Sequence, residues 1–197
     1  MSQFIESIKV EDQKAFLLDL HQQRVHETFA HFGKECSIDL EKIFKDLEHD
    51  EDGLYKLRIV YDLEGNFKTQ MLPYAFPEIE TFELVENNDF SYDFKFADRT
   101  EFEKMKKKAR AQEIIIVKNG QITDTSFSNL LFLKNQTWYT PKSFLLNGVQ
   151  RQNLLKQGII KETEITLQNL NEFSHFQLIN SMNEFNQDFV YSIEELK

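Results

Sequence analysis

The feature that most constrains this chain is a β-hairpin around residues 114–125. Ile114-Ile-Ile-Val117 is a short continuous apolar run, which is typical of a buried strand, and Lys118-Asn-Gly-Gln121 follows at once. Asn-Gly is the preferred pair for a two-residue hairpin turn, because both residues tolerate positive φ. The return strand begins at Ile122. It therefore carries Asp124, an acidic side chain just past the turn, among several hydroxyl residues.

The first part of the chain has the pattern of a small α+β domain, which we expect to span residues 1–85. A helix over residues 19–32 would present the apolar stripe Leu20, Val25, Phe29 and Phe32, and Gly33 is a plausible C-terminal stop. A second helix fits residues 39–47, with Ser37 or Asp39 as its cap. Short strands are expected at residues 4–10, 15–18, 56–61 and 67–72.

A polar connector at residues 86–94 leads into what we expect to be a larger C-terminal domain at residues 95–197. Besides the hairpin, this part should contain helices at 99–108 and 151–157. Further strands are expected at residues 130–133, 137–139, 161–166, 176–179 and 189–193.

Composition excludes several classes of function. The net charge of −10 disfavours nonspecific binding to nucleic acid or to an acidic membrane, and we interpret the basic run Lys104–Lys108 as a solvated helix face. The single cysteine, Cys36, cannot form an intramolecular disulfide and fits a reducing cytosol. There is no Cys/His ligand spacing, signal peptide or apolar run long enough to span a bilayer. We expect a cytoplasmic protein without a metal, nucleic-acid or membrane partner.

Two residues are candidates for chemistry. Lys95 stands between Phe94 and Phe96, and apolar surroundings lower the pKa of an amine, as a Schiff-base lysine requires. The competing interpretation is a surface lysine on a strand edge. Asp124 could keep a cofactor's ring nitrogen protonated, or it could be a turn aspartate that bonds its own backbone.

Other positions could bind an anion. Gly148 precedes Val149 and Gln150 at the start of a helix, where backbone N–H groups attract phosphate. Arg24, within the first expected helix, could pair with phosphate or with a nearby glutamate. Ser181 could donate to phosphate or merely form a turn, and Asn129 could cap the strand that follows it.

Taken in chain order, these segments resemble the class IV aminotransferase family, the fold-type IV pyridoxal-phosphate (PLP) enzymes. The matching segments are His21-Gln-Gln-Arg24, Lys95, Asp124 with Asn129, Thr140-Pro141, Leu146-Asn-Gly-Val-Gln-Arg151 and Asn180-Ser181. The resemblance covers residues 4–187.

The resemblance implies two α/β domains of the D-amino-acid aminotransferase type, with PLP at the domain interface and usually a homodimer. It implies that Lys95 is the Schiff-base lysine and that Asp124 contacts the pyridine nitrogen within the family's acidic-x4-Asn pattern, which Asn129 completes. Phosphate would be bound by Arg24, by the backbone amides of Val149 and Gln150, and by Ser181.

The sequence departs from the family pattern at several positions. Asp124 replaces the usual glutamate and is one methylene shorter. Gln150 replaces a threonine, which removes one hydroxyl from the phosphate site. Thr100 stands where branched-chain members carry a tyrosine, five residues after the lysine. Compared with the family, we also expect a shortened N-terminal part, since the chain begins almost at the first strand.

Among family activities, the sequence favours an aminodeoxychorismate lyase, which eliminates pyruvate from its small-molecule substrate to leave 4-aminobenzoate. Lys95-Phe-Ala-Asp-Arg99, Asn180-Ser-Met182 and the absent tyrosine favour the lyase. A transaminase acting on branched-chain or D-amino acids is the alternative, and a cofactor-free binding protein on the same fold is a lesser one. Glu6 and Ser7 would face the substrate by family position, although as strand residues they could equally be structural. The true substrate, the face of proton transfer and the oligomer size stay open.

Overall fold

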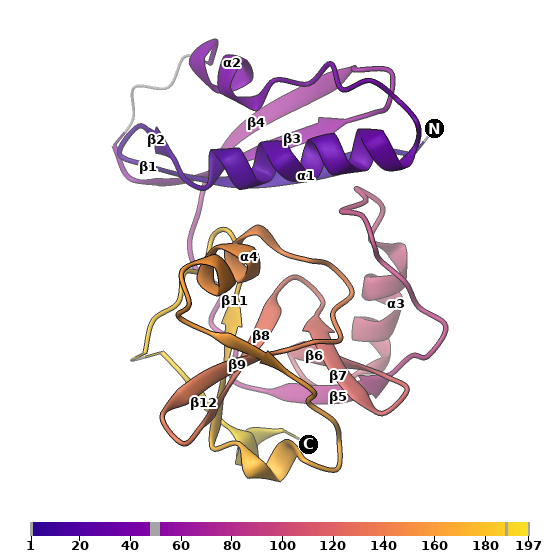
Figure 1. Cartoon of the computed structure of the whole chain (residues 1–197), viewed down its shortest axis with the longest axis vertical. Helices are drawn as coiled ribbons and strands as arrows, with labels where there is room; N and C mark the ends of the chain where they lie inside the picture. The colour runs from indigo at the N-terminus through magenta and orange to yellow at the C-terminus, as the bar shows by residue number, and fades with distance from the viewer. Residues whose placement is uncertain (1, 48–51, 188, 197) are drawn as a thin grey trace. The chain divides into compact units, whose positions relative to one another are not determined.

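The computed structural model of this chain describes residues 2–47, 52–187 and 189–196. It contains two compact units (Figure 1). Each unit has its own hydrophobic core. Unit 1 comprises Met1–Phe76 with Phe94–Asp98, and unit 2 comprises Pro77–Asp93 with Arg99–Lys197. This division differs from the boundaries expected at residues 85 and 95, because residues 82–86 pair within unit 2 whereas residues 95–97 bond within unit 1.

Unit 1 is built on a four-stranded antiparallel sheet in the order β2-β1-β3-β4. Helix α1 lies along one face of the sheet (Figure 1). The elements of this unit are β1 (Phe4–Glu11), β2 (Lys14–Ala15), α1 (Leu18–His31), α2 (Leu40–Lys45), β3 (Leu54–Tyr61) and β4 (Phe67–Pro73).

The core of unit 1 lies between this sheet and α1. Successive strand residues point to opposite faces, so the fully buried Phe4, Glu6 and Ile8 of β1 share one face. Val25 and Phe29 of α1 belong to the same core as Phe4 and Ile8. Glu6 therefore occupies a position in a series of otherwise apolar side chains.

The two expected helices of unit 1 are confirmed with small shifts of their ends. Gly33 adopts a φ of 65° and its N–H donates to the carbonyl of Ala30, so it ends α1 as the sequence predicts. Phe32, expected in the apolar stripe, is 40% exposed because it lies beyond the last helical turn. Asp39 caps α2 by accepting from the N–H of Lys42 at 2.9 Å.

The segment that carries Lys95 bonds to the N-terminal end of β1. The N–H of Ile5 donates to the carbonyl of Lys95 at 2.9 Å, and the N–H of Ala97 donates to the carbonyl of Gln3 at 2.8 Å. Phe4 and Phe96 face each other as an antiparallel bridge, with stacked rings 5.2 Å apart. Lys95 is thus held by a chain segment 90 residues away, which local sequence could not reveal.

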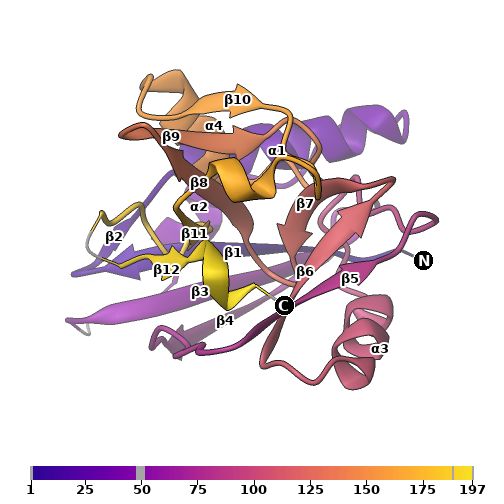
Figure 2. The same ribbon diagram turned by 90° about the horizontal axis from the view of Figure 1, so that it is seen from below.

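Unit 2 contains two sheets (Figure 2). One has the order β5-β6-β7, formed by β5 (Phe82–Glu86), β6 (Glu113–Lys118) and β7 (Gln121–Thr125). The other has the order β10-β9-β8-β11-β12, formed by β8 (Asn129–Lys134), β9 (Thr137–Pro141), β10 (Lys161–Thr163), β11 (His175–Ile179) and β12 (Tyr191–Ser192). The helices are α3 (Thr100–Lys108) and α4 (Val149–Lys156), with 3-10 turns η1 (Leu170–Glu172) and η2 (Ile193–Glu195). Ile115, Ile122, Leu130 and Phe176 from both sheets share one core.

The hairpin predicted at residues 114–125 is confirmed. Asn119 and Gly120 have φ angles of 51° and 74°, and Lys118 pairs with Gln121 across the turn. The register then shifts, because Val117 pairs with Ile122 whereas Ile115 pairs with Thr125. β7 therefore holds one extra residue between these pairs, a β-bulge that includes Asp124. Bulges re-aim side chains, so this one sets the direction of Asp124.

Three expected strands are shorter than the sequence suggested. Residues 15–18, 161–166 and 189–193 contribute only the short strands β2, β10 and β12. β10 pairs in parallel with β9, and its last pair is Thr163 with Pro141, a residue that has no N–H to continue the ladder. β5 was not expected at all; it pairs in parallel with β6.

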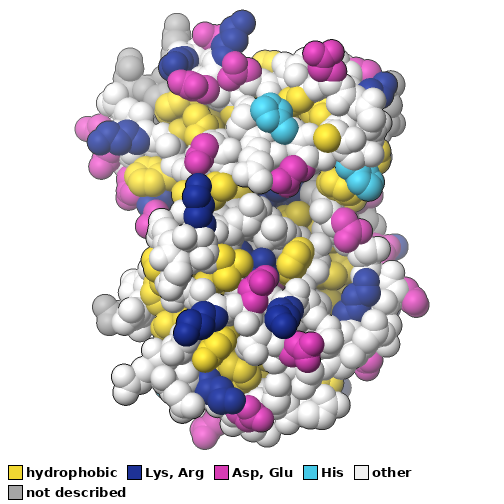
Figure 3. Space-filling model, in the orientation of Figure 1, with side chains coloured by type: hydrophobic (Ala, Val, Ile, Leu, Met, Phe, Trp, Pro, Cys, Tyr) yellow, Lys and Arg dark blue, Asp and Glu magenta, His cyan; other side chains and the backbone are white. Residues whose placement is uncertain are grey.

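Charged side chains of both signs are interspersed on the face shown in Figure 3. On α3, Phe102 and Met105 are buried whereas Lys104, Lys107 and Lys108 are exposed. The lysines at 104, 107 and 108 therefore form a solvated helix face, as the sequence predicts, whereas Lys106 is half-buried and bonds to Glu113. Among the described residues, no helix has both the length and the apolar character needed to cross a membrane.

Candidate active site

The candidate site residues fall into two groups, one in each unit. Glu6, Ser7, Arg24 and Lys95 belong to unit 1. Asp124, Asn129, Val149, Gln150 and Ser181 belong to unit 2. Within each unit the structure shows which of them are connected.

In unit 1, Arg24 forms a two-point ion pair with Glu6. Nε of Arg24 donates to Oε1 of Glu6 at 2.9 Å, and Nη2 donates to Oε2. Glu6 is fully buried and Arg24 is 8% exposed. Of the two partners that the sequence allowed for Arg24, the glutamate is the one observed. Its role toward phosphate stays a prediction.

His21 completes this cluster from the preceding turn of α1. Its Nδ1 lies 2.5 Å from Oε2 of Glu6, and the spacing His21-x-x-Arg24 puts both side chains on one helix face. Burial lowers the pKa of His21, and the positive charges of Arg24 and Lys95 lower it further, although Glu6 opposes this. When His21 is neutral and its Nδ1 carries the proton donated to Glu6, its Nε2 is a hydrogen-bond acceptor. This Nε2 atom is buried and has no hydrogen-bond partner among the described residues.

Glu6 keeps its negative charge despite full burial. Burial alone would raise the pKa of this carboxyl, but the charge of Arg24 and the bonds from His21 and Arg24 outweigh it and lower the pKa to about 2. Glu6 is therefore ionised at neutral pH. Ser7, the other expected substrate residue, is half-buried on the opposite face of β1.

In unit 2, Asp124 is held by three N–H donors. The side-chain amide of Asn129 donates to Oδ1 at 2.9 Å, and the backbone N–H groups of Leu145 and Leu146 donate to Oδ2 at 3.0 and 2.9 Å. Asp124 is 5% exposed. The alternative of an aspartate that bonds its own turn is not what the structure shows, since its donors come from β8 and from residues 145–146.

Burial dominates the acidity of Asp124. It raises the pKa of this carboxyl to about 6, although the bonds from Leu146, Asn129 and Leu145 and the charge of Arg151 act in the opposite direction. A carboxylate has about four acceptor positions, and three are used. One position on Oδ1 can still accept from a cationic N–H.

The start of α4 lies directly beside Asn129. Gly148 precedes Val149 in extended conformation, and no side chain caps the helix. A Cβ at Gly148 would lie 2.1 Å from Oδ1 of Asn129, so only glycine allows this approach. The structure thus connects Asp124, Asn129 and the N-terminus of α4.

Ser181 lies within a turn that Asn180 organises. Oδ1 of Asn180 accepts from the N–H groups of Met182 and Asn183 at 2.8 Å, and Nδ2 donates to Oγ of Ser128 at 2.9 Å. The segment with Ser181 is therefore anchored to the turn between Asp124 and Asn129.

Two buried charged residues of unit 2, Arg151 and Glu113, are not among the candidates predicted from the sequence. Arg151 is 2% exposed and donates to Asn147 and to the carbonyl of Pro141, and it also pairs with Glu162. Glu113 is 1% exposed. For Glu6, by contrast, the sequence did hold a signal. Its place on the apolar face of an alternating strand indicates a buried carboxylate, which needs a cationic partner such as Arg24.

Comparison with known proteins assigns the family. The sequence pattern of the amino-transferase class IV family matches residues 3–186. The chain belongs to this family. It is therefore a PLP-dependent enzyme with the fold-type IV architecture, as the resemblance implied.

Three similar proteins illustrate the relationship. A candidate 4-amino-4-deoxychorismate lyase from Haemophilus somnus 129pt is 34% identical, with a TM-score of 0.87 over 94% of this chain and 98% of that one. An uncharacterised protein of Haemophilus influenzae is 30% identical over 93% of this chain and 99% of its own length. A branched-chain aminotransferase from Thermoproteus uzoniensis shares the fold, with 15% identity and a TM-score of 0.77 over 99% of this chain and 78% of that one.

The residues present fit PLP. The remaining acceptor position on the buried carboxylate of Asp124 matches a protonated ring nitrogen. The start of α4, which no side chain caps, matches a phosphate. Within the described ranges, no group of three or more His, Cys, Asp or Glu could hold a metal ion.

Proposed function

We propose that this chain is a PLP-dependent lyase that eliminates pyruvate from 4-amino-4-deoxychorismate and releases 4-aminobenzoate. The observation that carries the choice of substrate is the 34% identity, over almost the whole of both chains, to the candidate lyase of Haemophilus somnus. The absence of the tyrosine that branched-chain members carry at position 100 also supports a lyase. Thr100, which stands there, is the exposed first residue of α3.

Each site residue has a role in this proposal. Lys95 would hold the cofactor through its amine and, once released, remove the substrate's α-proton as a general base. Bound PLP would supply an electron sink for the resulting carbanion. Asp124, oriented by Asn129, would keep a proton on the ring nitrogen.

Phosphate would be bound by the backbone amides of Val149 and Gln150, with Ser181 as a further donor. Arg24 would add a charge-assisted bond while its other nitrogens remain on Glu6. In this assignment, Glu6 supports Arg24 rather than touching the substrate.

The reaction balances without a second substrate. Loss of the α-proton and cleavage of the ether bond to the enolpyruvyl group give 4-aminobenzoate and pyruvate, and the substrate ring becomes aromatic. No keto acid is consumed, which separates this activity from transamination. We further propose a cytoplasmic homodimer that acts in folate biosynthesis.

The decisive experiment incubates the purified, PLP-loaded enzyme with 4-amino-4-deoxychorismate and without any keto acid. We expect equal amounts of 4-aminobenzoate and pyruvate, and no product from Lys95→Ala. A parallel incubation contains branched-chain or D-amino acids with 2-oxoglutarate. Product only in the second incubation would identify a transaminase and overturn the proposal.

A further inference from the structure

The turn Thr125–Ser128 connects the two residues that the proposed function assigns to the ring nitrogen. Asp124 precedes it and Asn129 follows it. Oγ1 of Thr125 accepts from the N–H groups of Phe127 and Ser128 at 3.3 and 2.9 Å, and the N–H of Thr125 donates to the carbonyl of Ser128 at 2.8 Å. The turn is therefore closed by its own residues.

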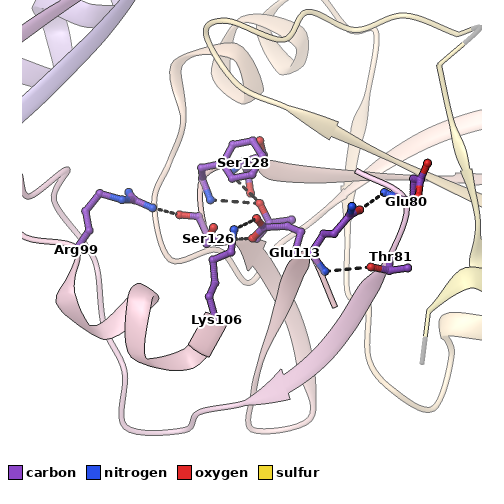
Figure 4. A network of polar contacts seen from close by, with 10 residues as sticks. Glu80, Thr81, Arg99, Lys106, Glu113, Ser126 and Ser128 are labelled. Atoms are coloured by element: carbon purple, nitrogen blue, oxygen red, sulfur yellow. Dashed lines mark hydrogen bonds and ion pairs between the residues drawn. The ribbon is translucent and has the colours of Figure 1, made fainter. Parts of the chain in front are cut away.

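Charged side chains also hold this turn from outside. Oε1 of Glu113 accepts from the N–H of Ser126 at 2.9 Å, and Nη2 of Arg99 donates to the carbonyl of Ser126 (Figure 4). The guanidinium of Arg99 lies 4.6 Å from the ring centre of Phe102 on α3. Both backbone polar groups of Ser126 are thus bonded to charged side chains from different parts of unit 2.

Glu113 is itself fixed in place. Its Oε2 accepts from Nζ of Lys106 at 2.7 Å, and its backbone N–H donates to the carbonyl of Thr81 at 3.1 Å. The neighbouring Gln112 bonds to Thr81 and Glu80, which ties the start of β6 to the chain before β5 (Figure 4). A buried carboxylate needs such partners, because an unpaired buried charge is strongly unfavourable.

A turn closed by Thr125 does not need a buried ion pair to keep its shape. The residue whose orientation matters for the proposed function is Asp124. It lies in the bulge, where the regular pairing of β7 with β6 is interrupted. Holding Ser126, two residues further along, restricts how the bulge can rotate. We propose that Glu113 and Arg99 are positioning residues that fix the direction of the Asp124 carboxylate. The catalytic consequence rests on the proposed function of Asp124, but the positioning itself does not.

The test uses the cofactor-free protein with 13C-labelled aspartate, and Asp124→Asn identifies the Asp124 signal. The variants are Glu113→Ala and Arg99→Met, which remove the contacts to Ser126. Glu113→Gln keeps an acceptor for the N–H of Ser126. Lys104→Met is the matched control, because Lys104 forms an exposed ion pair with Glu101 on the same α3.

We expect Glu113→Ala and Arg99→Met to admit water to Asp124 and to move its pKa from about 6 toward its ordinary value of 3.8. Glu113→Gln and Lys104→Met should leave the titration unchanged. If the first two variants lower the melting temperature but leave the Asp124 titration unchanged, their role is only structural and the proposal is wrong. Should Glu113→Ala fail to fold, the titration of Asp124 in Arg99→Met decides the question in the same way.

A second measurement connects the positioning to the cofactor. In protein loaded with 15N-labelled PLP, the ring-nitrogen shift reports its protonation, and we expect Glu113→Ala to change it while Glu113→Gln does not. If Asp124→Asn leaves this shift and the activity unchanged, the proposed role of Asp124 fails. The cofactor-free titration would still decide the role of Glu113 and Arg99.

Discussion

The side-chain amide of Asn129 joins Asp124 to the chain before α4. Its Nδ2 lies 2.9 Å from Oδ1 of Asp124 and 2.9 Å from the carbonyl oxygen of Leu146. Oδ1 of Asn129 faces Gly148, where a Cβ would come within 2.1 Å. One asparagine therefore fixes the acid, the loop and the start of the helix relative to one another within unit 2.

The first prediction concerns this close approach. Gly148→Ala should destabilise the protein by about 1–3 kcal/mol, because the added methyl must displace Asn129 from a packed site. Asn129→Ala removes the obstructing atom, so the double variant should lose less stability than the two single variants together. Denaturant unfolding of all four proteins measures this coupling. Additive losses would mean that Asn129 does not limit residue 148.

The second prediction concerns the cofactor. Purified protein supplied with PLP should be yellow, and borohydride should fix the cofactor onto the peptide that contains Lys95, as mass spectrometry would detect. Lys95→Ala should abolish the fixation, whereas Lys104→Ala, which changes an exposed lysine, should not. Unchanged absorbance and fixation in Lys95→Ala would disprove the assignment.

The third prediction concerns the charge of Asp124. Asp124→Asn keeps the size of the side chain but removes the charge that would hold a proton on the ring nitrogen. Activity should fall by roughly 10²–10³-fold, while the cofactor stays bound through its phosphate and Lys95. Turnover and cofactor absorbance are measured on the same sample. Near-normal turnover would remove Asp124 from the mechanism.

The fourth prediction concerns Arg24 and phosphate. In the neutral double variant Glu6→Gln with Arg24→Gln, loss of a charge-assisted contact should weaken PLP binding by about 1.5–3 kcal/mol. Neutralising both partners avoids leaving either charge buried alone. Binding of pyridoxal, which has no phosphate, serves as the control and should change little. Equal losses for both compounds would contradict a phosphate role.

The fifth prediction concerns stability and pH. The pKa of Glu6 is lowered in the folded protein from 4.5 to about 2, so its contribution is present above pH 4.5 and is lost as the pH falls toward 2. Glu6→Gln should therefore cost roughly 3 kcal/mol at pH 7, and the cost should shrink over this acidic range. The raised pKa of Asp124 changes the stability with pH in the opposite direction. Because Asp124 is present in both proteins, its contribution cancels when their unfolding free energies are subtracted.

Unfolding free energies of wild type and Glu6→Gln between pH 2 and pH 7 check this prediction. Glu101→Gln is the control, since its exposed pair with Lys104 should contribute little at any pH. A deficit of Glu6→Gln that does not depend on pH would show that lost packing, rather than lost charge, causes it.

The sequence alone determined the elements whose signals are local. Asn119-Gly120 specified the hairpin, because its turn needs positive φ at two successive residues. Gly33 and Asp39 marked a helix end and a helix start for equally local reasons. The order of the short motifs sufficed to indicate the family.

Tertiary structure alone decided how distant segments pair. Lys95 is held beside β1, β5 joins β6, and a bulge turns Asp124 toward donors from residues 129, 145 and 146. Glu6 and Arg24 looked like independent candidates until the fold buried them together. Such pairings depend on which surfaces become buried against each other, and a buried charge acquires its partner and its pKa only when the whole core has formed.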